Sequence, residues 1–517
     1  MSDHTLEAPA LQVPDAPPRR RARREENPLL ALARRYPWVL AAAGLLIVSL
    51  LVILWAGSRP GYDPYGWLTW GKLTIHGKLD TNGAPSWKPL PFLFTVPMAL
   101  FGKYQLWLWM VFSIAVSLAG PIFAWRIAFR ITGADPARRY AAYAAGLFAA
   151  AFMFFMQDTV SHLTYTHYLL SAESDTMIVA LVLAAIDFHL AGRHRVAFWT
   201  WWFASLGRPE VWPFYGLAGI WLWLKVPSYR RWLYASVALL LFFWFGIPGL
   251  TSKSVFTAGN IAQNSPREIH GNKVTGTITR FHQMLPTTVW ILTALTVMVA
   301  AIRRNLVVLA LAVGALAWLV IEIALALKGY PAVPRYLFEA GAVVAVLGGV
   351  FLGWLILELP GLLTRLADRV SRPRVAPRVT AQLGAWGTGV AVLLIAGSTF
   401  GAAHHQYRLE RVDLTHERAR ALEIGRLSVV VQKLGANRIL ACGQPDIPIG
   451  YQSQFAWYAE VKIGELYVSP TYERKHPHPL VQMYPLSNGW KVRPKLPVNA
   501  TPATVARCSG LTLTYRS

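Results

Sequence analysis

The feature that most constrains this chain is a recurring run of apolar residues. From residue 38 to 403, apolar runs of roughly 16 to 24 residues alternate with short connections rich in arginine. A helix needs about 20 such residues to cross the hydrocarbon core of a bilayer. Because lipid offers no hydrogen-bond partners to the backbone, these runs are expected to form helices. The sequence therefore predicts an all-α polytopic membrane protein.

We expect about 11 transmembrane or half-membrane helices. Their approximate positions are 38–57, 104–128, 140–157, 174–191, 196–207, 211–225, 232–250, 286–302, 305–327, 337–358 and 384–403. The fifth and sixth are too short to cross alone, and Gly207-Arg208-Pro209-Glu210 separates them. They are expected to be two half-length helices that meet within or near the membrane. A simple kink carrying an Arg208–Glu210 ion pair is the alternative.

Composition and charge agree with a membrane protein. Hydrophobic residues make up 54% of the 517, which is too apolar for an ordinary soluble protein. The net charge of +24 would suit a nucleic-acid partner, but the basic residues lie in short clusters between apolar runs and in the last hundred or so positions. Such clusters mark the cytoplasmic ends of membrane helices. We therefore expect a plasma-membrane protein with a cytoplasmic N-terminus and no nucleic-acid partner.

The chain is expected to have three parts. Residues 1–28, rich in Pro, Ala and Arg, read as a disordered basic cytoplasmic tail. Residues 29–403 form the transmembrane part, and an odd number of spans places 404–517 outside the cell. Alternating stretches at 438–442 and 465–468 indicate a small extracytoplasmic α/β domain.

The only two cysteines of the chain, Cys442 and Cys508, lie in this C-terminal part. A disulfide between them would fit an oxidising compartment. Two unpaired buried cysteines are the alternative.

The first outer loop holds the main candidate for chemistry. Asp63 follows the first span and is surrounded by Tyr and Trp in Gly61-Tyr62-Asp63-Pro64-Tyr65-Gly66-Trp67. A carboxylate at interfacial depth is expected to gain basicity, and aromatic faces can hold a sugar. Asp63 is therefore a candidate general base. Alternatively, Asp63 and Asp80 cap short interfacial helices.

Other outer segments carry charged candidates with two interpretations each. Glu173 and Asp175 stand at the start of the fourth span. They could bind a metal or the acceptor, or they could simply be acids favoured at a helix N-terminus. Arg335, between Pro334 and Tyr336, suits a phosphate because guanidinium binds its oxygens in a fork. Lys88 is a second phosphate candidate. For both basic residues the alternative is snorkelling to lipid headgroups.

The order of these features resembles the GT-C superfamily of membrane glycosyltransferases, which use polyprenyl-phosphate sugars. The resemblance covers roughly residues 38–358: a first span, an acid in Gly61-Tyr62-Asp63-Pro64-Tyr65, then Ser86-Trp87-Lys88-Pro89-Leu90, paired short helices around Gly207-Arg208-Pro209-Glu210, and Pro334-Arg335-Tyr336-Leu337. The chain lacks a phosphate-binding Gly-rich loop, a His-Glu-x-x-His and a Gly-x-Ser-x-Gly elbow, so nucleotide hydrolysis and the common hydrolase chemistries are unsupported.

The resemblance implies a specific reaction. Asp63 would act as base on an acceptor hydroxyl, the sugar would invert, and Arg335 with Lys88 would stabilise the leaving lipid phosphate. Candidate acceptor or metal contacts are Asp80, Glu173, Asp175, Arg208 and Glu210. The acceptor could be a glycan, a lipid or a protein. No soluble cofactor is required, and a divalent metal stays open because Pro64 stands where family members often carry a second acid.

Two other functions are compatible with the same layout. A transporter or flippase for a lipid-linked sugar would also need an aromatic cavity and a phosphate-binding arginine. Transporters more often consist of two matching halves, and the sequence has no evident internal repeat. An envelope scaffold protein is the third interpretation, and it would leave the Asp63 loop without a role.

Overall fold

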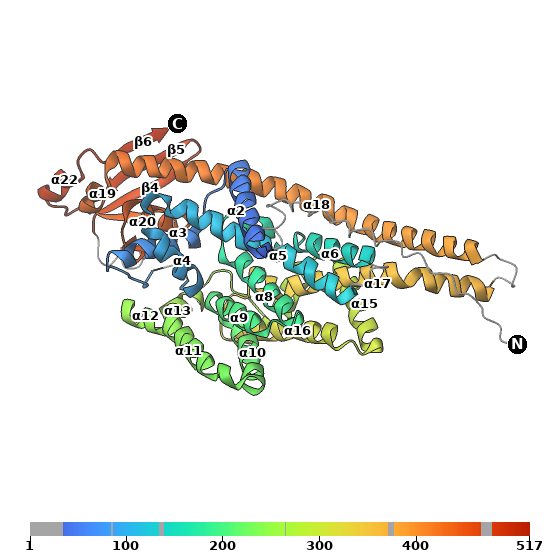
Figure 1. Cartoon of the computed structure of the whole chain (residues 1–517). Helices are drawn as coiled ribbons and strands as arrows, with labels where there is room; N and C mark the ends of the chain where they lie inside the picture. The colour runs from blue at the N-terminus through green and yellow to red at the C-terminus, as the bar shows by residue number, and fades with distance from the viewer. Residues whose placement is uncertain are drawn as a thin grey trace, which may run out of the picture. The chain divides into compact units, whose positions relative to one another are not determined.

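A computed structural model describes residues 35–83, 86–133, 139–263, 265–370, 377–466 and 478–516. The chain divides into two compact units, residues 1–44 and 45–517. The described part of the first unit contains the start of helix α2 (Pro37–Ala56). The tail predicted at 1–28 lies outside the described residues. The arrangement described below is that of the second unit (Figure 1).

Five helices in the described part of the chain are long and apolar enough to cross a membrane. They are Pro37–Ala56, Gly102–Thr132, Pro227–Thr251, Leu306–Leu327 and Pro334–Leu366. A sixth candidate is the bent pair α14 (Lys273–Gln283) and α15 (Thr287–Arg303), whose axes turn by 99°. The multi-pass architecture is thus observed, whereas the expected count of about 11 spans is not confirmed.

Several apolar runs form helices shorter than a span. They are α6 (Arg139–Met153), α8 (Ser174–Leu190), α9 (His194–Gly207) and α10 (Trp212–Lys225). At 1.5 Å per residue, helices of 14 to 17 residues measure about 21 to 26 Å, against a core of about 30 Å. Hydropathy alone could not distinguish these helices from full spans, because side chains that pack against neighbouring helices are apolar as well. α6 packs against α5 (Gln105–Thr132), and α8 packs against α5 and α9.

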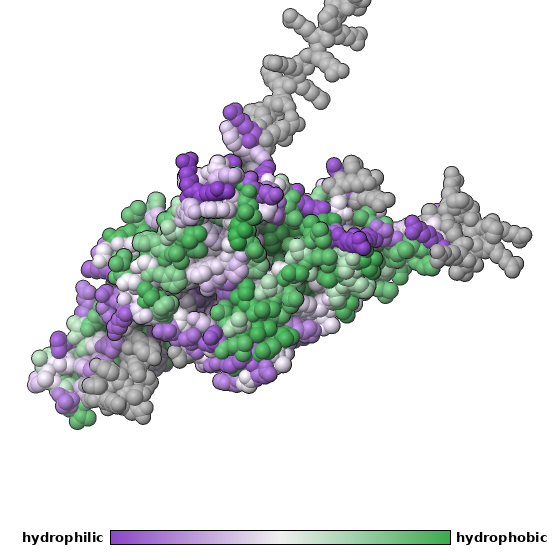
Figure 2. All heavy atoms as spheres, turned by 90° about the horizontal axis from the view of Figure 1, so that it is seen from below, coloured by the Kyte–Doolittle hydropathy of each residue, from purple (hydrophilic) through white to green (hydrophobic). Residues whose placement is uncertain are grey.

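Helix α17 (Phe338–Val370) is the central element of the helical part. Of its most apolar window, 78% is buried, far more than in any other candidate span of the described chain. It contacts α5, α6, α8, α15 and α16 (Leu306–Leu327). Gly349 lets α6 approach, since a Cβ there would meet the backbone of Ala145 and Ala149. Broad hydrophobic areas on the surface of the helices are visible in Figure 2, as expected for contact with lipid.

Shorter helices and strands lie between or within the candidate spans, and several of the charged side chains discussed below lie in them or at their ends. These are α3 (Tyr62–Ile75), α4 (Pro89–Ala99), β1 (Gln157–Asp158), β2 (Leu163–Thr164), α7 (Tyr165–Leu170), η3 (Pro209–Val211), α11 (Arg230–Leu241), α12 (Ile247–Thr251), α13 (Thr257–Gln263) and η6 (Pro334–Leu337). β1 and β2 pair antiparallel.

The long helix α18 (Pro377–Leu434) packs beside α17 and leads into a small C-terminal sheet (Figure 1). The strands are β3 (Gln444–Asp446), β4 (Leu480–Leu486), β5 (Gly489–Lys495) and β6 (Leu513–Arg516), in the order β3-β4-β5-β6. β3 is parallel to β4, and the other pairs are antiparallel. The last turns of α18 cover this sheet and share its separate hydrophobic core.

The C-terminal part is a mixed α/β fold, as predicted, but its strands lie elsewhere than expected. Residues 438–442 fall in helix α19 (Ala436–Cys442), which follows Gly435 at a positive φ of 77°. Leu466 ends the 3-10 helix η8 (Ile463–Leu466), and 467–468 lie outside the described residues. Runs of five residues or fewer are too short for alternation to distinguish a strand from a helical turn.

Cys442 and Cys508 form a disulfide that links the end of α19 to α22 (Pro502–Cys508). The bridge closes a loop with a sequence separation of 66 residues. A loop of this length removes about 4 kcal/mol of chain entropy from the unfolded state. The disulfide therefore stabilises a small domain whose own hydrophobic core is limited.

Candidate active site

Asp63 lies in the first turn of α3, directly after the link from α2. Helix α2 ends at Ala56, Gly57 follows with φ of 65°, and α3 begins at Tyr62 with Gly61 as its N-cap. An acid in this turn is favoured by the helix dipole, as the alternative interpretation stated. Its carboxylate also faces a cation, because Asp63 Oδ2 lies 4.0 Å from Arg335 Nη2. The helix-end position and a role in the site are thus compatible.

Arg335 is presented by η6, the short 3-10 helix before α17. Its guanidinium lies over the rings of Tyr168, at 5.6 Å, and Tyr336, at 5.5 Å. The side chain is 17% exposed, and its Nε has no hydrogen-bond partner. Arg335 therefore points into the protein beside Asp63 and does not snorkel outward, and it retains donor capacity for an anion.

The turn before Arg335 is held by another arginine. Arg280 of α14 donates to the carbonyl oxygens of Pro331 and Ala332, the latter at 3.3 Å. Ala332 has a positive φ of 43°, a conformation that residues other than glycine rarely adopt. These hydrogen bonds stabilise a turn that would otherwise be strained.

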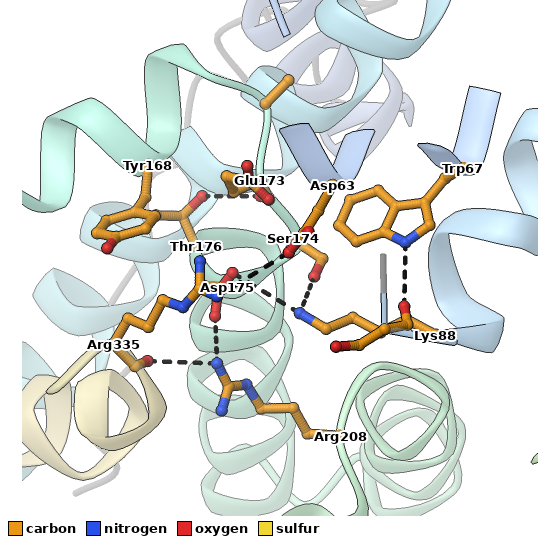
Figure 3. A network of polar contacts seen from close by, with 12 residues as sticks. Asp63, Trp67, Lys88, Tyr168, Glu173, Ser174, Asp175, Thr176, Arg208 and Arg335 are labelled. Carbon is orange, nitrogen blue, oxygen red and sulfur yellow. Dashed lines mark hydrogen bonds and ion pairs between the residues drawn. The ribbon is translucent and has the colours of Figure 1, made fainter. Parts of the chain in front are cut away.

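Asp175 is at the centre of the charged network in Figure 3. It is completely buried in the first turn of α8, and its carboxylate pairs with Arg208 and, at 3.8 Å, with Lys88 Nζ. Lys88 Nζ also donates to Ser174 Oγ at 2.8 Å. Arg208 Nη2 in turn donates to the carbonyl oxygen of Arg335 at 3.4 Å. The Asp175 carboxylate thus joins two segments distant in sequence to the start of α8, and Arg208 links a third through the carbonyl oxygen of Arg335.

Arg208 stands between α9 and α10, where the chain breaks as predicted. It is 3% exposed and faces two further carboxylates, Glu339 at 3.4 Å and Glu210 at 3.9 Å. The Arg208–Glu210 pair of the kink interpretation therefore exists, but it is the longest of the three. Glu322 is also buried, at 1% exposure, as an acid within an apolar helix should be.

The structure brings together most of the residues singled out in the sequence. They are Asp63, Lys88, Glu173, Asp175, Arg208, Glu210 and Arg335. Asp80 does not join them, because it pairs with Lys462 of the C-terminal part at 3.7 Å and accepts a hydrogen bond from the backbone of Asn82. Glu339 was not predicted. An acid four residues after Arg335, inside an apolar run, was the signal that would have identified it.

Glu173 and the neighbouring tyrosines are poor candidates for the base. Burial raises the pKa of Glu173 well above its usual 4.5, and the charge of Asp63 adds to the effect. Burial likewise raises the pKa of Tyr62 to about 12, again with a contribution from Asp63, and that of Tyr168 well above 10. A raised pKa disfavours the ionised form of each group, and a general base must be ionised. Asp63 therefore remains the candidate base, and its side chain, like that of Arg335, is partly exposed.

The raised pKa of Glu173 predicts a pH-dependent effect of Glu173→Gln. Below the unfolded pKa of about 4.5, both folded and unfolded states hold the proton, so Glu173 contributes nothing to the pH dependence. As pH rises above that value, the unfolded state ionises before the folded state does, and stability is lost. We therefore expect Glu173→Gln to match wild type near pH 4.5 and to unfold at a higher temperature at pH 8. Equal unfolding temperatures at pH 8 would contradict the buried, neutral state.

The two acids considered as metal ligands, Glu173 and Asp175, contact other groups of the protein. Within the described ranges, no three His, Cys, Asp or Glu side chains are arranged to hold a metal ion. Asp175, one of the two acids considered as ligands, is occupied by Arg208 and Lys88. Glu173 lies against Gly61, where a Cβ would collide with its carboxyl group.

An apolar groove of about 510 Å³ borders the charged network. It runs between α8, α9, α10, α16 and α17, from Leu306 at one end of α16 past Trp318 and Trp201. Glu339, which faces Arg208, is its acidic lining residue. The groove therefore connects the hydrophobic helices to the polar site.

Comparison with known proteins gives matches among solved structures alone. No family model and no curated protein matches the chain. The apo crystal structure of an oligosaccharyltransferase from Archaeoglobus fulgidus matches with a TM-score of 0.40 and 13% identity, covering 81% of this chain and 64% of that one. The oligosaccharyltransferase AglB from the same organism, in complex with an inhibitory peptide and a dolichol-phosphate, matches with a TM-score of 0.38 and 12% identity, covering 87% and 70%.

Both matched structures are oligosaccharyltransferases. The chain spans about 64% of the length of the first.

Proposed function

We propose that this protein is a membrane glycosyltransferase that moves a sugar from a polyprenyl-phosphate donor to an acceptor hydroxyl. The observation that carries the proposal is the pairing of Asp63 with Arg335 at 4.0 Å, on the partly exposed edge of a buried charged network. A base and a phosphate-binding cation must flank one reacting carbon in such a transfer. The two side chains lie side by side although 272 positions of sequence separate them, and the donor and acceptor would have to enter between them.

In the proposed reaction, Asp63 accepts the proton of the acceptor hydroxyl. The acceptor oxygen forms a bond to the anomeric carbon, and the bond from that carbon to the phosphate oxygen breaks. The configuration inverts, and the polyprenyl phosphate leaves with the electron pair. Arg335 and Lys88 stabilise the new negative charge. Because phosphate is already a fair leaving group, positioning, base assistance and fixed positive charge suffice, and no soluble cofactor is needed.

The apolar groove supports a lipid-linked donor. Its walls would bury part of a polyprenyl chain among Trp201, Phe214 and Trp318, while the end at Glu339 adjoins the charged network. Burial of apolar surface is worth about 25 cal/mol per Å². The site would then lie on the extracytoplasmic side, with the N-terminus in the cytoplasm, as the positions of the arginine-rich connections predict.

Removing the guanidinium of Arg335 should weaken donor binding and transfer together. We expect Arg335→Gln to lower kcat/KM for the donor by about 10²-fold, since one preorganised charge contact is worth about 10² to 10³ in rate. The matched control is Arg303→Gln, whose partner Glu358 is 46% exposed at the other end of the helices. Kinetics measured over donor concentration give the result, and unchanged kcat/KM in Arg335→Gln would exclude a phosphate contact.

The function itself is tested by a donor panel. Purified protein in detergent is incubated with radiolabelled polyprenyl phosphates carrying glucose, mannose, galactose or arabinose, and with glycan, lipid and peptide acceptors. Transfer from at least one donor, with an inverted product linkage, is the expected result. If no donor supports transfer and the same lipids instead cross vesicle membranes that contain the protein, the flippase alternative is correct.

A further inference from the structure

The link between α2 and α3, residues 57–61, is held by two arginines of α18. We call this link the elbow. We infer that Arg418 and Arg420 are positioning residues that fix the elbow and thereby aim the Asp63 carboxylate. This inference rests on the proposed function, in which Asp63 is the base. Its contacts lie outside the charged network described above.

Arg418 caps the end of α2. The last carbonyl groups of a helix have no partners within the helix. Arg418 Nε donates to the carbonyl oxygen of Ala56 at 3.0 Å, and its Nη2 donates to that of Trp55 at 2.9 Å. A cation at a helix C-terminus is also favoured by the helix dipole. The point where the chain leaves α2 is therefore fixed by α18, which is 362 residues further along the sequence.

Arg420 holds the elbow itself. Its Nη1 donates to the carbonyl oxygen of Pro60 at 3.0 Å, and its Nη2 donates to that of Arg59 at 2.9 Å. The planar fork of a guanidinium suits two adjacent acceptors. Glu417, which is 1% exposed, orients the fork by accepting from Arg420 Nε at 3.1 Å. Because Asp63 comes three residues after Pro60, a shift of the elbow would move its carboxylate.

The elbow is also joined to the segment before Glu173. Gly61 N donates to the carbonyl oxygen of Ser171 at 2.8 Å, and Arg420 Nη2 lies 3.4 Å from Ser171 Oγ. Arg420 thus contacts both chain segments that lead to the carboxyl groups of Asp63 and Glu173. Arg420 therefore holds the elbow and the segment before Glu173 in a fixed position relative to each other.

The C-terminal part contacts α3 a second time, further along the helix. Lys72 pairs with Glu460 at 2.9 Å, and the ring of Tyr65 lies 5.7 Å from that of Trp457. Helix α3 is therefore held at its start by α18 and along its side by α20 (Gln452–Ala459). Since a misplacement of about 1 Å can cost about 10²-fold in rate, these contacts are expected to matter for turnover.

The inference is tested with Arg420→Gln, Arg418→Gln and the double variant, against Arg408→Gln. Arg408 is an exposed residue on the same helix and serves as the matched control. Hydrogen exchange of peptides covering residues 55–66 should become at least tenfold faster in the double variant. Exchange in α5 and α17 should stay unchanged. Arg408→Gln should match wild type throughout.

Turnover separates positioning from a general loss of structure. We expect Arg420→Gln to lower kcat by about 10- to 100-fold while the donor KM stays within about twofold, and Arg420→Lys to recover part of kcat. Unchanged exchange at 55–66, or a normal kcat in the double variant, would overturn the inference. If wild type shows no transfer with any donor, the proposed function fails. The exchange data then test the elbow contacts alone. Faster exchange at 55–66 in the double variant would support the fixing of the elbow by Arg418 and Arg420, and unchanged exchange would contradict it.

Discussion

Asp63→Asn should abolish nearly all transfer while leaving the protein folded. A positioned base contributes about 10² to 10⁴ in rate, so we expect kcat to fall by about 10³-fold. Asparagine keeps the shape of the side chain but cannot take the acceptor proton. The Asp63–Arg335 contact is 4.0 Å long and partly exposed, so its loss should cost little stability.

The matched control for this substitution is Asp80→Asn. Asp80 lies in the same loop region but pairs with Lys462, away from the network. Its substitution should leave kcat within about threefold of wild type. Binding of undecaprenyl phosphate, measured by protection against thermal unfolding, should survive in Asp63→Asn. Retention of more than a tenth of the wild-type kcat in Asp63→Asn would exclude Asp63 as the base.

Much of the site could be predicted because its residues follow a simple rule of position. Asp63, Asp175 and Arg335 each stand at the start of a helix, and Arg208 stands at a break between two. Charged residues at such points are visible in a hydropathy pattern. Counting the spans predicts that these helix ends share one side of the membrane, and the structure brings their side chains close together.

The remaining features depend on tertiary packing that the pattern does not contain. Asp80 was included because it shares a loop with Asp63, yet its side chain turns toward Lys462 in the C-terminal part. Glu339 stands out as an acid in an apolar run, but hydropathy does not show that its face of α17 meets Arg208. The expected count of about 11 spans is not confirmed, because α6 and α8, which it included, are shorter than a span and are also apolar through contacts with other helices. Arg418 and Arg420 contact the end of α2 and the elbow, which lie more than 350 residues earlier in the chain, and no local sequence pattern predicts such a contact.

Asp175→Asn should produce the largest loss of stability. Asp175 is completely buried and pairs with Arg208, which is 3% exposed, and with Lys88. Removing one partner of a buried ion pair typically costs about 3 to 5 kcal/mol, because the remaining charge is left without compensation. Thermal unfolding in detergent should therefore occur several degrees lower than in wild type, and transfer should fall with it.

A comparison with an exposed pair decides whether burial is the cause. Glu460→Gln removes the partner of Lys72, but Glu460 is 62% exposed, so the cost should be about 0.5 kcal/mol or less.

The double variant Asp175→Asn/Arg208→Gln provides the sharper control. If the loss in Asp175→Asn comes from a buried guanidinium that has lost its closest partner and keeps only Glu339 and Glu210, removing that guanidinium as well should restore part of the stability, so the two substitutions will not be additive. Strict additivity, or an Asp175→Asn protein as stable as Glu460→Gln, would show that Asp175 does not hold the network together. Recovery of stability without recovery of transfer would show that Arg208 also supports the position of Arg335, whose carbonyl oxygen it binds at 3.4 Å.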